Sequence, residues 1–436
     1  MTEKIVKTAE DLQDLMVHFR REFHEFPELS WTEFRTASRV AINLESMGFK
    51  TLVGEEIMCG SLMKNVPPAH ELELQMERAK AQGAELPYLD RMKGGKTGVV
   101  GILETGKPGP VIAIRFDMDA LPIIESDSSK HFPAREGFRS RNEGLMHSCG
   151  HDGHTAIGMG VAALLTKIRD ELKGTIKLIF QPAEEGVQGG ATSIIKMGVV
   201  DDADYMLSFH LGMAPLPATL FCETTGFLAT TKFDINFIGK SAHSGANPED
   251  GKSALLAAAA ATMAMQGIYR HSAGASRISV GVFNSGTASN IVPDRAFLEL
   301  ETRGETTEIN DFMKREVYRI LEGAARMYDC EVDLRPEVVE TGEAISAESD
   351  PELVALTKEI AEELDIFDAI EDSVSIGGSE DYTYFMERVQ QKGGKALHFS
   401  VAADLKAKHH NELFDFSEDV LWKIAALLGV MIVRLK

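Results

Sequence analysis

The most regular feature of the chain is a set of short apolar runs beginning near residue 98. Four such runs, at residues 98–103, 111–116, 175–180 and 205–209, have the length and composition of buried strands. A helical pattern from Thr155 to about Leu172 separates the second run from the third. This alternation predicts an α/β layered domain with a largely parallel sheet.

The region before these runs is predicted to be helical. Apolar residues recur at helical spacing from Ala9, the turn around Pro27 interrupts them, and a second periodic stretch ends at Gly48. Two helices are therefore expected there. Residues 64–96 are charged and helix-prone, which predicts a surface insertion with its own helix.

A different pattern extends from about residue 229 to 336. Phe233, Ile235 and Phe237 alternate with polar residues, as in a half-exposed strand. A helix (253–269), two strands (around 278–282 and 298–300), a helix (307–328) and a last strand (330–334) follow. The order βαββαβ predicts a ferredoxin-like domain at 226–337, inserted into a first domain of residues 1–225 and 338–436.

Composition supports an ordinary globular protein. A chain of 436 residues exceeds one typical core, so two domains are expected. No membrane span is indicated, and the polar N-terminus lacks the apolar core of a secretory signal, which favours the cytoplasm. The net charge of -22 argues against nucleic-acid binding. The four cysteines indicate free thiols rather than a disulfide framework.

Potential metal ligands or catalytic acids follow successive predicted strands. Asp117 and Asp119 follow the second run, although such acids can equally belong to a solvated turn. Cys149 and His151 then precede a helix, with further histidines on either side. This density of thiol and imidazole indicates a transition-metal site. A Cys–His nucleophilic pair is the competing interpretation, but it leaves the flanking acids unexplained.

The next two strands add further groups. Glu184 and Glu185 follow the third run, where one glutamate could bind metal while the other accepts a proton from water. A pair of glutamates that only caps a loop is the alternative. His210 follows the fourth run. Ligands bind beyond the carboxyl ends of strands in open α/β sheets, so these groups are expected to converge.

The motifs that carry these groups resemble those of the M20 amidohydrolase/carboxypeptidase family. The matching segments run in order along essentially the whole chain: residues 23–30 with Glu33 and Thr36, then 117–122, 149–154, 181–185, 239–243 and 290–294. The resemblance implies a metal-dependent amidohydrolase with two domains. In such proteins a mixed, mostly parallel sheet flanked by helices carries the metals, and a ferredoxin-like insertion serves as lid and dimerisation domain.

The resemblance also implies roles for individual residues. The metal ligands would be Cys149, His151, Glu185, His210 and His410, holding two divalent ions. Zn or Mn suits this donor set best, with Co or Ni as alternatives. His410 fits the family spacing to Phe414 and Asp415, whereas its neighbour His409 does not. Glu184 would be the general base, Asp119 would orient a metal-bound imidazole, and His154 is expected to be structural.

Residues of the inserted domain complete the implied site. His243 would stabilise the oxyanion, often in the neighbouring subunit of a dimer, and Asn290 would contact substrate. Arg303 could pair with a substrate carboxylate through its planar guanidinium. The alternative for Arg303 is an ordinary surface arginine.

Within the family, the insertion at 64–96 and the segment 408–416 resemble the group that hydrolyses p-aminobenzoyl-glutamate to p-aminobenzoate and glutamate. The implied partners are a small N-acyl amino acid and either a second copy or a related B subunit. Two alternatives stay open: an amidohydrolase of another N-acyl amino acid, such as a hippurate or an auxin conjugate, and a non-catalytic partner protein on the same fold.

Overall fold

The computed structural model describes all 436 residues and divides into two compact units. Unit 1 consists of residues 1–225, 347–376 and 381–436, and unit 2 of residues 226–346 and 377–380. No helix is both long and apolar enough to cross a membrane.

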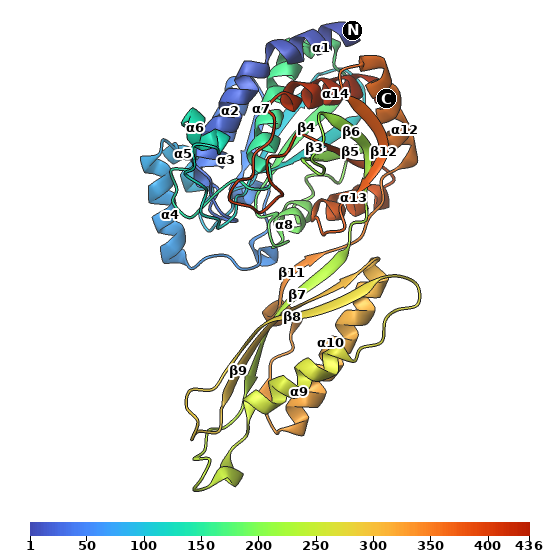
Figure 1. Cartoon of the computed structure of the whole chain (residues 1–436). Helices are drawn as coiled ribbons and strands as arrows, with labels where there is room; N and C mark the ends of the chain where they lie inside the picture. The colour runs from blue at the N-terminus through green and yellow to red at the C-terminus, as the bar shows by residue number, and fades with distance from the viewer. The chain divides into compact units, whose positions relative to one another are not determined.

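Unit 1 is built on one eight-stranded sheet in the order β1-β2-β4-β3-β5-β13-β6-β12 (Figure 1). Strands β4, β3, β5 and β13 run parallel to one another, and β12 runs parallel to β6. The remaining neighbours are antiparallel. The strands are β1 (Lys50–Val53), β2 (Val99–Glu104), β3 (Val111–Asp117), β4 (Thr175–Gln181), β5 (Tyr205–Leu211), β6 (Thr219–Thr225), β12 (Ala369–Ser375) and β13 (Lys395–Val401).

Helices cover both faces of this sheet. One face packs against α1 (Thr2–Asp11), α2 (Gln13–Glu25), α3 (Phe34–Ser46), α7 (His151–Lys167), α12 (Pro351–Leu364) and α14 (Val420–Arg434). The other face packs against α8 (Gly190–Lys196) and α13 (Tyr382–Gln391). The shorter helices α4 (Ala69–Ala81), α5 (Leu86–Arg91) and α6 (Phe132–Glu136) lie at the periphery of the unit.

The central helix of unit 1 is α7. Every side chain from His151 to Leu165 is buried, because α1, α2 and α14 pack on one side of α7 and β3, β4 and β5 on the other. A helix that is apolar nearly all round is typical of such a position. The first turn of α7 is therefore held in place at the carboxyl ends of the strands.

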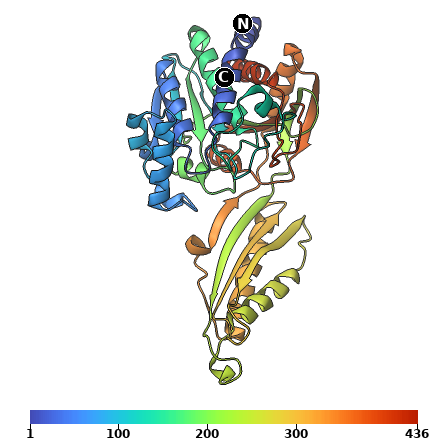
Figure 2. The same cartoon turned by 60° about the vertical axis from the view of Figure 1, so that its left-hand side comes forward.

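Unit 2 is a four-stranded antiparallel sheet with one helical face. Its strands β10-β7-β9-β8 have the order of a βαββαβ ferredoxin-like fold (Figure 2). The apolar side chains of β7 and β9 pack beneath α9 and α10. The elements are β7 (Ala229–Ile238), α9 (Ala254–Gln266), β8 (Ser276–Ser285), β9 (Arg295–Gly304), α10 (Thr307–Met327), β10 (Glu331–Val332), α11 (Pro336–Val339) and β11 (Glu340–Ala344).

Two boundaries differ from the sequence expectation. The inserted unit extends to residue 346 rather than 337, because β11 pairs antiparallel with β7. Three helices rather than two precede β1, because α1 forms a separate helix before the break at Leu12. The predicted class is otherwise confirmed: a mixed, mostly parallel sheet flanked by helices, with a ferredoxin-like insertion.

Candidate active site

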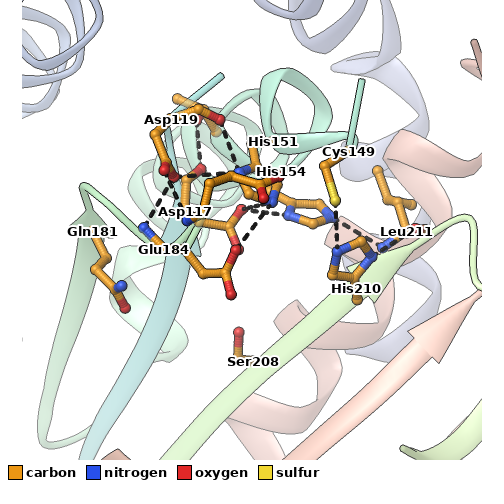
Figure 3. Close-up of polar contacts among 12 residues, drawn as sticks. Asp117, Asp119, Cys149, His151, His154, Gln181, Glu184, Ser208, His210 and Leu211 are labelled. Atoms are coloured by element: carbon orange, nitrogen blue, oxygen red, sulfur yellow. Dashed lines mark hydrogen bonds and ion pairs between the residues drawn. The ribbon is translucent and has the colours of Figure 1, made fainter. Parts of the chain in front are cut away.

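The site lies at the carboxyl edge of β3, β4 and β5 in unit 1 (Figure 3). Asp117 is opposite Gln181 in the β3–β4 register, and His210 is the penultimate residue of β5. The segment just before α7 brings Cys149 to the same edge. The predicted convergence of groups beyond successive strands is therefore what the fold produces.

A glycine turn places Cys149 and His151 side by side. Gly150, between them, has φ +90°, which a residue with a Cβ rarely adopts. The Cys149 Sγ lies 3.6 Å from Nε2 of His210. The ligand atoms of Cys149, His151 and His210 all lie within 4.8 Å of one another.

The hydrogen bonds of His151 and His210 leave one nitrogen of each ring free to act as a ligand. The Nδ1 of His151 lies 2.9 Å from the carbonyl oxygen of Asp119, and that of His210 lies 2.7 Å from the carbonyl oxygen of Leu211. Because a carbonyl only accepts, Nδ1 carries the proton in both rings and Nε2 keeps its lone pair. The Nε2 of His151 is buried and has no hydrogen-bond partner. Metal-binding histidines are oriented in this way.

His154 has both ring nitrogens engaged. Its Nδ1 lies 2.5 Å from Oδ1 of Asp117, and its Nε2 accepts a hydrogen bond of 2.9 Å from the Leu211 N–H. Asp117 is also paired with Arg115 at 2.5 Å. His154 therefore links the start of α7 to β3 and β5 and offers no lone pair to an ion.

A second group of donors overlaps the first. The ligand atoms of Cys149, Glu185 and His410 lie within 4.8 Å of one another. His410 Nε2 is 3.5 Å from Oε1 of Glu185, a buried atom with no hydrogen-bond partner. His410 has φ +59°, and its backbone N–H donates to the carbonyl of Ser148 at 2.8 Å.

His409 occupies a different environment. Its ring packs against the rings of His210 and Phe414, with centroids 5.2 and 5.0 Å away. His409 belongs to no donor group that could hold a metal ion, whereas His410 does.

The charges of the second group depend on one another. Hydrogen bonding to Cys149 and Glu185 raises the pKa of His410 to about 10. Burial, reinforced by the Glu185 carboxylate, raises the pKa of the Cys149 thiol. Without a cation, the group therefore retains protons that a metal ion would displace.

Asp119 shapes the turn that presents the two glutamates. Its carboxylate accepts hydrogen bonds from the backbone N–H groups of Glu184 (3.2 Å) and Glu185 (2.9 Å) and from the Ser30 hydroxyl (2.8 Å). Glu184 Oε2 lies 4.0 Å from Nε2 of His151. His151 is closer to the backbone oxygen of Asp119 than to its carboxylate, which is 3.4 Å away.

Several residues that hold this site together had no role predicted from sequence. Glu33 is fully buried and accepts hydrogen bonds from the Ala183 N–H (2.9 Å) and the Thr97 hydroxyl (2.6 Å). Arg115 and Gln181 both bond to the Asp381 carboxylate. The only signal was position: Glu33 lies in a motif that resembles the family, and Gln181 directly follows an apolar strand.

The donor set fits divalent metal ions. Sulfur, imidazole nitrogen and carboxylate oxygen are the ligands that zinc prefers. Two overlapping groups share Cys149, and a third, formed by His151, Glu184 and Glu185, connects them. The unpartnered Nε2 of His151 and Oε1 of Glu185 are the kind of buried atom that requires a partner.

His243 and Asn290 lie together at one end of unit 2. The Ser244 N–H donates to the Asn290 carbonyl at 3.1 Å, and both side chains are exposed. The Nδ1 of His243 accepts hydrogen bonds of 3.1 Å from the backbone N–H groups of Gly245 and Ala246. Because Nδ1 accepts, the neutral ring carries its proton on Nε2 and presents a donor.

Arg303 lies at the other end of the same sheet. Asn290 and His243 are in loops beyond the Arg295 end of β9, whereas Arg303 is near its last residue. An antiparallel strand rises about 3.4 Å per residue, so roughly 27 Å of β9 separates Arg303 from Arg295. Arg303 is paired with Glu301 at 2.9 Å. Unit 2 thus does not bring Arg303 together with His243 and Asn290.

Comparison with known proteins identifies the family. The family model described as "Peptidase family M20/M25/M40" matches residues 113–434. The chain belongs to the M20 peptidase family. This confirms the resemblance in the sequence motifs and the prediction of an enzyme that hydrolyses amide bonds.

Individual M20 proteins are similar over nearly the whole chain. The p-aminobenzoyl-glutamate hydrolase of Escherichia coli, in its A component, is 44% identical, covering 96% of this chain and 95% of that protein. The indole-3-acetyl-aspartic acid hydrolase of Enterobacter agglomerans is 46% identical, covering 93% and 92%.

Solved structures agree. The aminobenzoyl-glutamate utilization protein of Klebsiella pneumoniae has a TM-score of 0.83 and 37% identity, covering 99% of this chain and 98% of that chain. A dinuclear metal-binding M20 peptidase from Bacillus subtilis has a TM-score of 0.69 and 25% identity, covering 97% and 98%.

Proposed function

We propose that this M20 enzyme uses two divalent metal ions to hydrolyse the amide bond of p-aminobenzoyl-glutamate, releasing p-aminobenzoate and glutamate. The observation that carries the proposal is the convergence of Cys149, His151, Glu185, His210 and His410 in unit 1, with two buried ligand atoms unpartnered. The substrate is supported by the Escherichia coli relative, which matches over nearly its full length.

In this mechanism Glu184 moves the proton. Bound divalent cations would supply the Lewis acidity that lowers the pKa of water and polarises the scissile carbonyl. Glu184 takes a proton from the attacking water and passes it to the leaving amine nitrogen. Its position beside His151 supports this role, and Asp119 supports it indirectly by fixing the backbone of the turn.

Residues of unit 2 are proposed to bind the rest of the substrate. The Nε2–H of His243 donates to the oxyanion as the carbonyl carbon becomes tetrahedral, and Asn290 contacts the substrate beside it. Arg303 binds a carboxylate of the glutamate product through its planar guanidinium. It would exchange its present partner, Glu301, for the substrate.

We further propose that two copies of the chain pair through unit 2. An N-acyl amino acid is much shorter than the length of β9 that separates Arg303 from the His243 end, so one unit 2 cannot place both on one substrate. The unpaired edge of β8 and the exposed face of α9 offer a surface for a second copy. From Ala254 to Tyr269 this segment has no charged residue, although Leu256 and Met263 are 48% and 75% exposed. A related B subunit is the alternative partner.

A second candidate substrate is an N-acyl aspartate such as indole-3-acetyl-aspartate. The Enterobacter agglomerans relative that acts on this compound, by its name, has 46% identity to this chain. Both candidate substrates release an acidic amino acid, which is the feature that Arg303 is proposed to bind.

A direct assay tests the function. Chelated and metal-reloaded enzyme should be compared on p-aminobenzoyl-glutamate, indole-3-acetyl-aspartate and hippurate, with and without a B-type partner. We expect hydrolysis that requires metal and is fastest with p-aminobenzoyl-glutamate. Activity unchanged by chelation would contradict the metal mechanism, and faster hydrolysis of another substrate would reassign the specificity.

A further inference from the structure

Arg20, on α2, is a buried cation at the junction of three segments. Its side chain is fully buried, and each of its nitrogens reaches a different carboxylate. Nε is 3.0 Å from Asp152, Nη2 is 2.7 Å from Asp415, and Nη1 is 3.1 Å from Glu418. Only the planar fork of an arginine can donate in three directions at once.

Two of these partners belong to the segments that present metal ligands. Asp152 directly follows His151 in the first turn of α7. Asp415 closes the segment that contains His410. The guanidinium therefore ties the His151 turn to the His410 segment without touching either histidine.

The His410 segment depends on such contacts for its shape. Residues 402–419 form neither helix nor strand, so no regular hydrogen-bond ladder fixes them. The Lys406 N–H donates to the carbonyl of Asp415 at 3.1 Å, which closes the segment into a loop around His410. The backbone bond from His410 to Ser148 is weak support for a residue held at φ +59°.

Packing reinforces the same connection. The Phe416 ring lies 4.4 Å from the guanidinium carbon of Arg20. It also approaches α7 so closely that a Cβ on Gly153 would lie 2.6 Å from its Cζ. The residue next to Asp415 is thus fitted between Arg20 and the first turn of α7.

The charges explain why the contact is specific. Asp152 also accepts from Nδ1 of His24 at 2.8 Å, whereas Arg20 is the sole cation paired with Asp415. Without Arg20 the Asp415 carboxylate would be buried and unpaired, and the loop would move to hydrate it.

We propose that Arg20 is a positioning residue for the metal site, which holds the His410 loop so that His410 lies beside Cys149 and Glu185. This inference rests on the metal site of the proposed function, but it requires nothing of the substrate. Arg20 acts through the loop and is not itself a ligand.

Metal titration of chelated protein tests the proposal. Zinc binding should be compared among the wild type, Arg20→Lys, Asp415→Asn and His410→Ala. Arg20→Lys and Asp415→Asn should keep one tight metal equivalent and weaken the other about 10- to 100-fold, as expected for residues that orient metal ligands. Arg21→Gln is the matched control, because Arg21 also bonds Glu418 but neither Asp152 nor Asp415.

A double-mutant cycle separates positioning from general stability. Adding Arg20→Lys to His410→Ala should weaken metal binding no further, because both changes remove the same ligand. Additive losses, wild-type affinity in Arg20→Lys, or equal weakening of both equivalents would overturn the proposal. If Arg20→Lys does not fold, Asp415→Asn decides by the same criteria. A wild type that binds no metal would instead refute the proposed function.

Discussion

The Glu184 carboxylate is the side chain on which the proposed chemistry depends most directly. Replacing it by glutamine in Glu184→Gln removes the proton acceptor but keeps the shape of the turn held by Asp119. We expect kcat to fall about 10²- to 10⁴-fold, the typical contribution of a general base. Metal content should stay at the wild-type level when it is measured by elemental analysis.

Glu387→Gln, at an exposed position on α13, provides the control and should leave kcat unchanged. Undiminished turnover by Glu184→Gln with intact metal content would exclude Glu184 as the base.

His24 couples the stability of unit 1 to pH. It is buried between Asp152 (2.8 Å) and Glu125 (2.9 Å). Burial lowers the pKa of His24, but the two carboxylates outweigh it and raise the pKa to about 9. An unfolded histidine titrates near pH 6.5, so this contribution is fully present below that pH and is lost as pH rises through about 9.

We therefore expect His24 to account for a loss of unfolding free energy on the order of 3 kcal/mol between about pH 6.5 and 9. Urea unfolding of the chelated protein at several pH values measures it. In His24→Gln the slope over this interval should flatten. An unchanged slope in that variant would rule out the contribution.

Single residues were predictable where they stand at the ends of apolar runs. Cys149, Glu185 and His210 attract notice because polar donors follow buried strands. Arg20 and His24 were not assigned a role, because charged residues on an amphipathic helix look solvent-exposed in sequence. Their burial depends on carboxylates such as Asp415, almost 400 positions away, which no local pattern reveals.

At the scale of elements, predictability followed the strength of the hydrophobic pattern. β3, β4 and β5 are apolar along their length and were located from sequence. β11, with the sequence Glu-Thr-Gly-Glu-Ala, has almost no apolar alternation and was missed. It forms because the edge of β7 is available to it, which is a tertiary effect. That omission displaced the boundary of unit 2.

The exposed apolar face of α9 is predicted to be an interface. Met263→Glu should weaken self-association about 100-fold or more, because it would bury an unpaired charge against the second copy. Sedimentation or light scattering over a range of concentrations measures the change. The fold of unit 2 should survive, since Met263 is 75% exposed.

Met327→Glu is the matched control. Met327 is another exposed methionine of unit 2, 70% exposed at the end of α10, outside the α9–β8 surface. Equal association of the wild type and Met263→Glu would show that α9 is not the contact.

At the scale of the whole molecule, the separation within unit 2 determines how many copies one site needs. His243 and Asn290 lie at one end of the sheet and Arg303 at the other. Rearrangement of a rigid unit 2 cannot bring both ends to the same substrate. If all three residues act, a catalytic centre must draw on unit 2 of two different copies, one for each end.

Mixing two inactive variants tests this arrangement. In a mixed dimer of Glu184→Gln and His243→Ala, one site would combine the intact Glu184 of one copy with the intact His243 of the other. Random exchange makes half of the dimers mixed, each with one of its two sites restored, so about a quarter of wild-type activity should return. The variants should be unfolded and refolded together, with each refolded alone as the control. If His243 served the site of its own copy, every site would keep one defect and the mixture would show no more activity than its components.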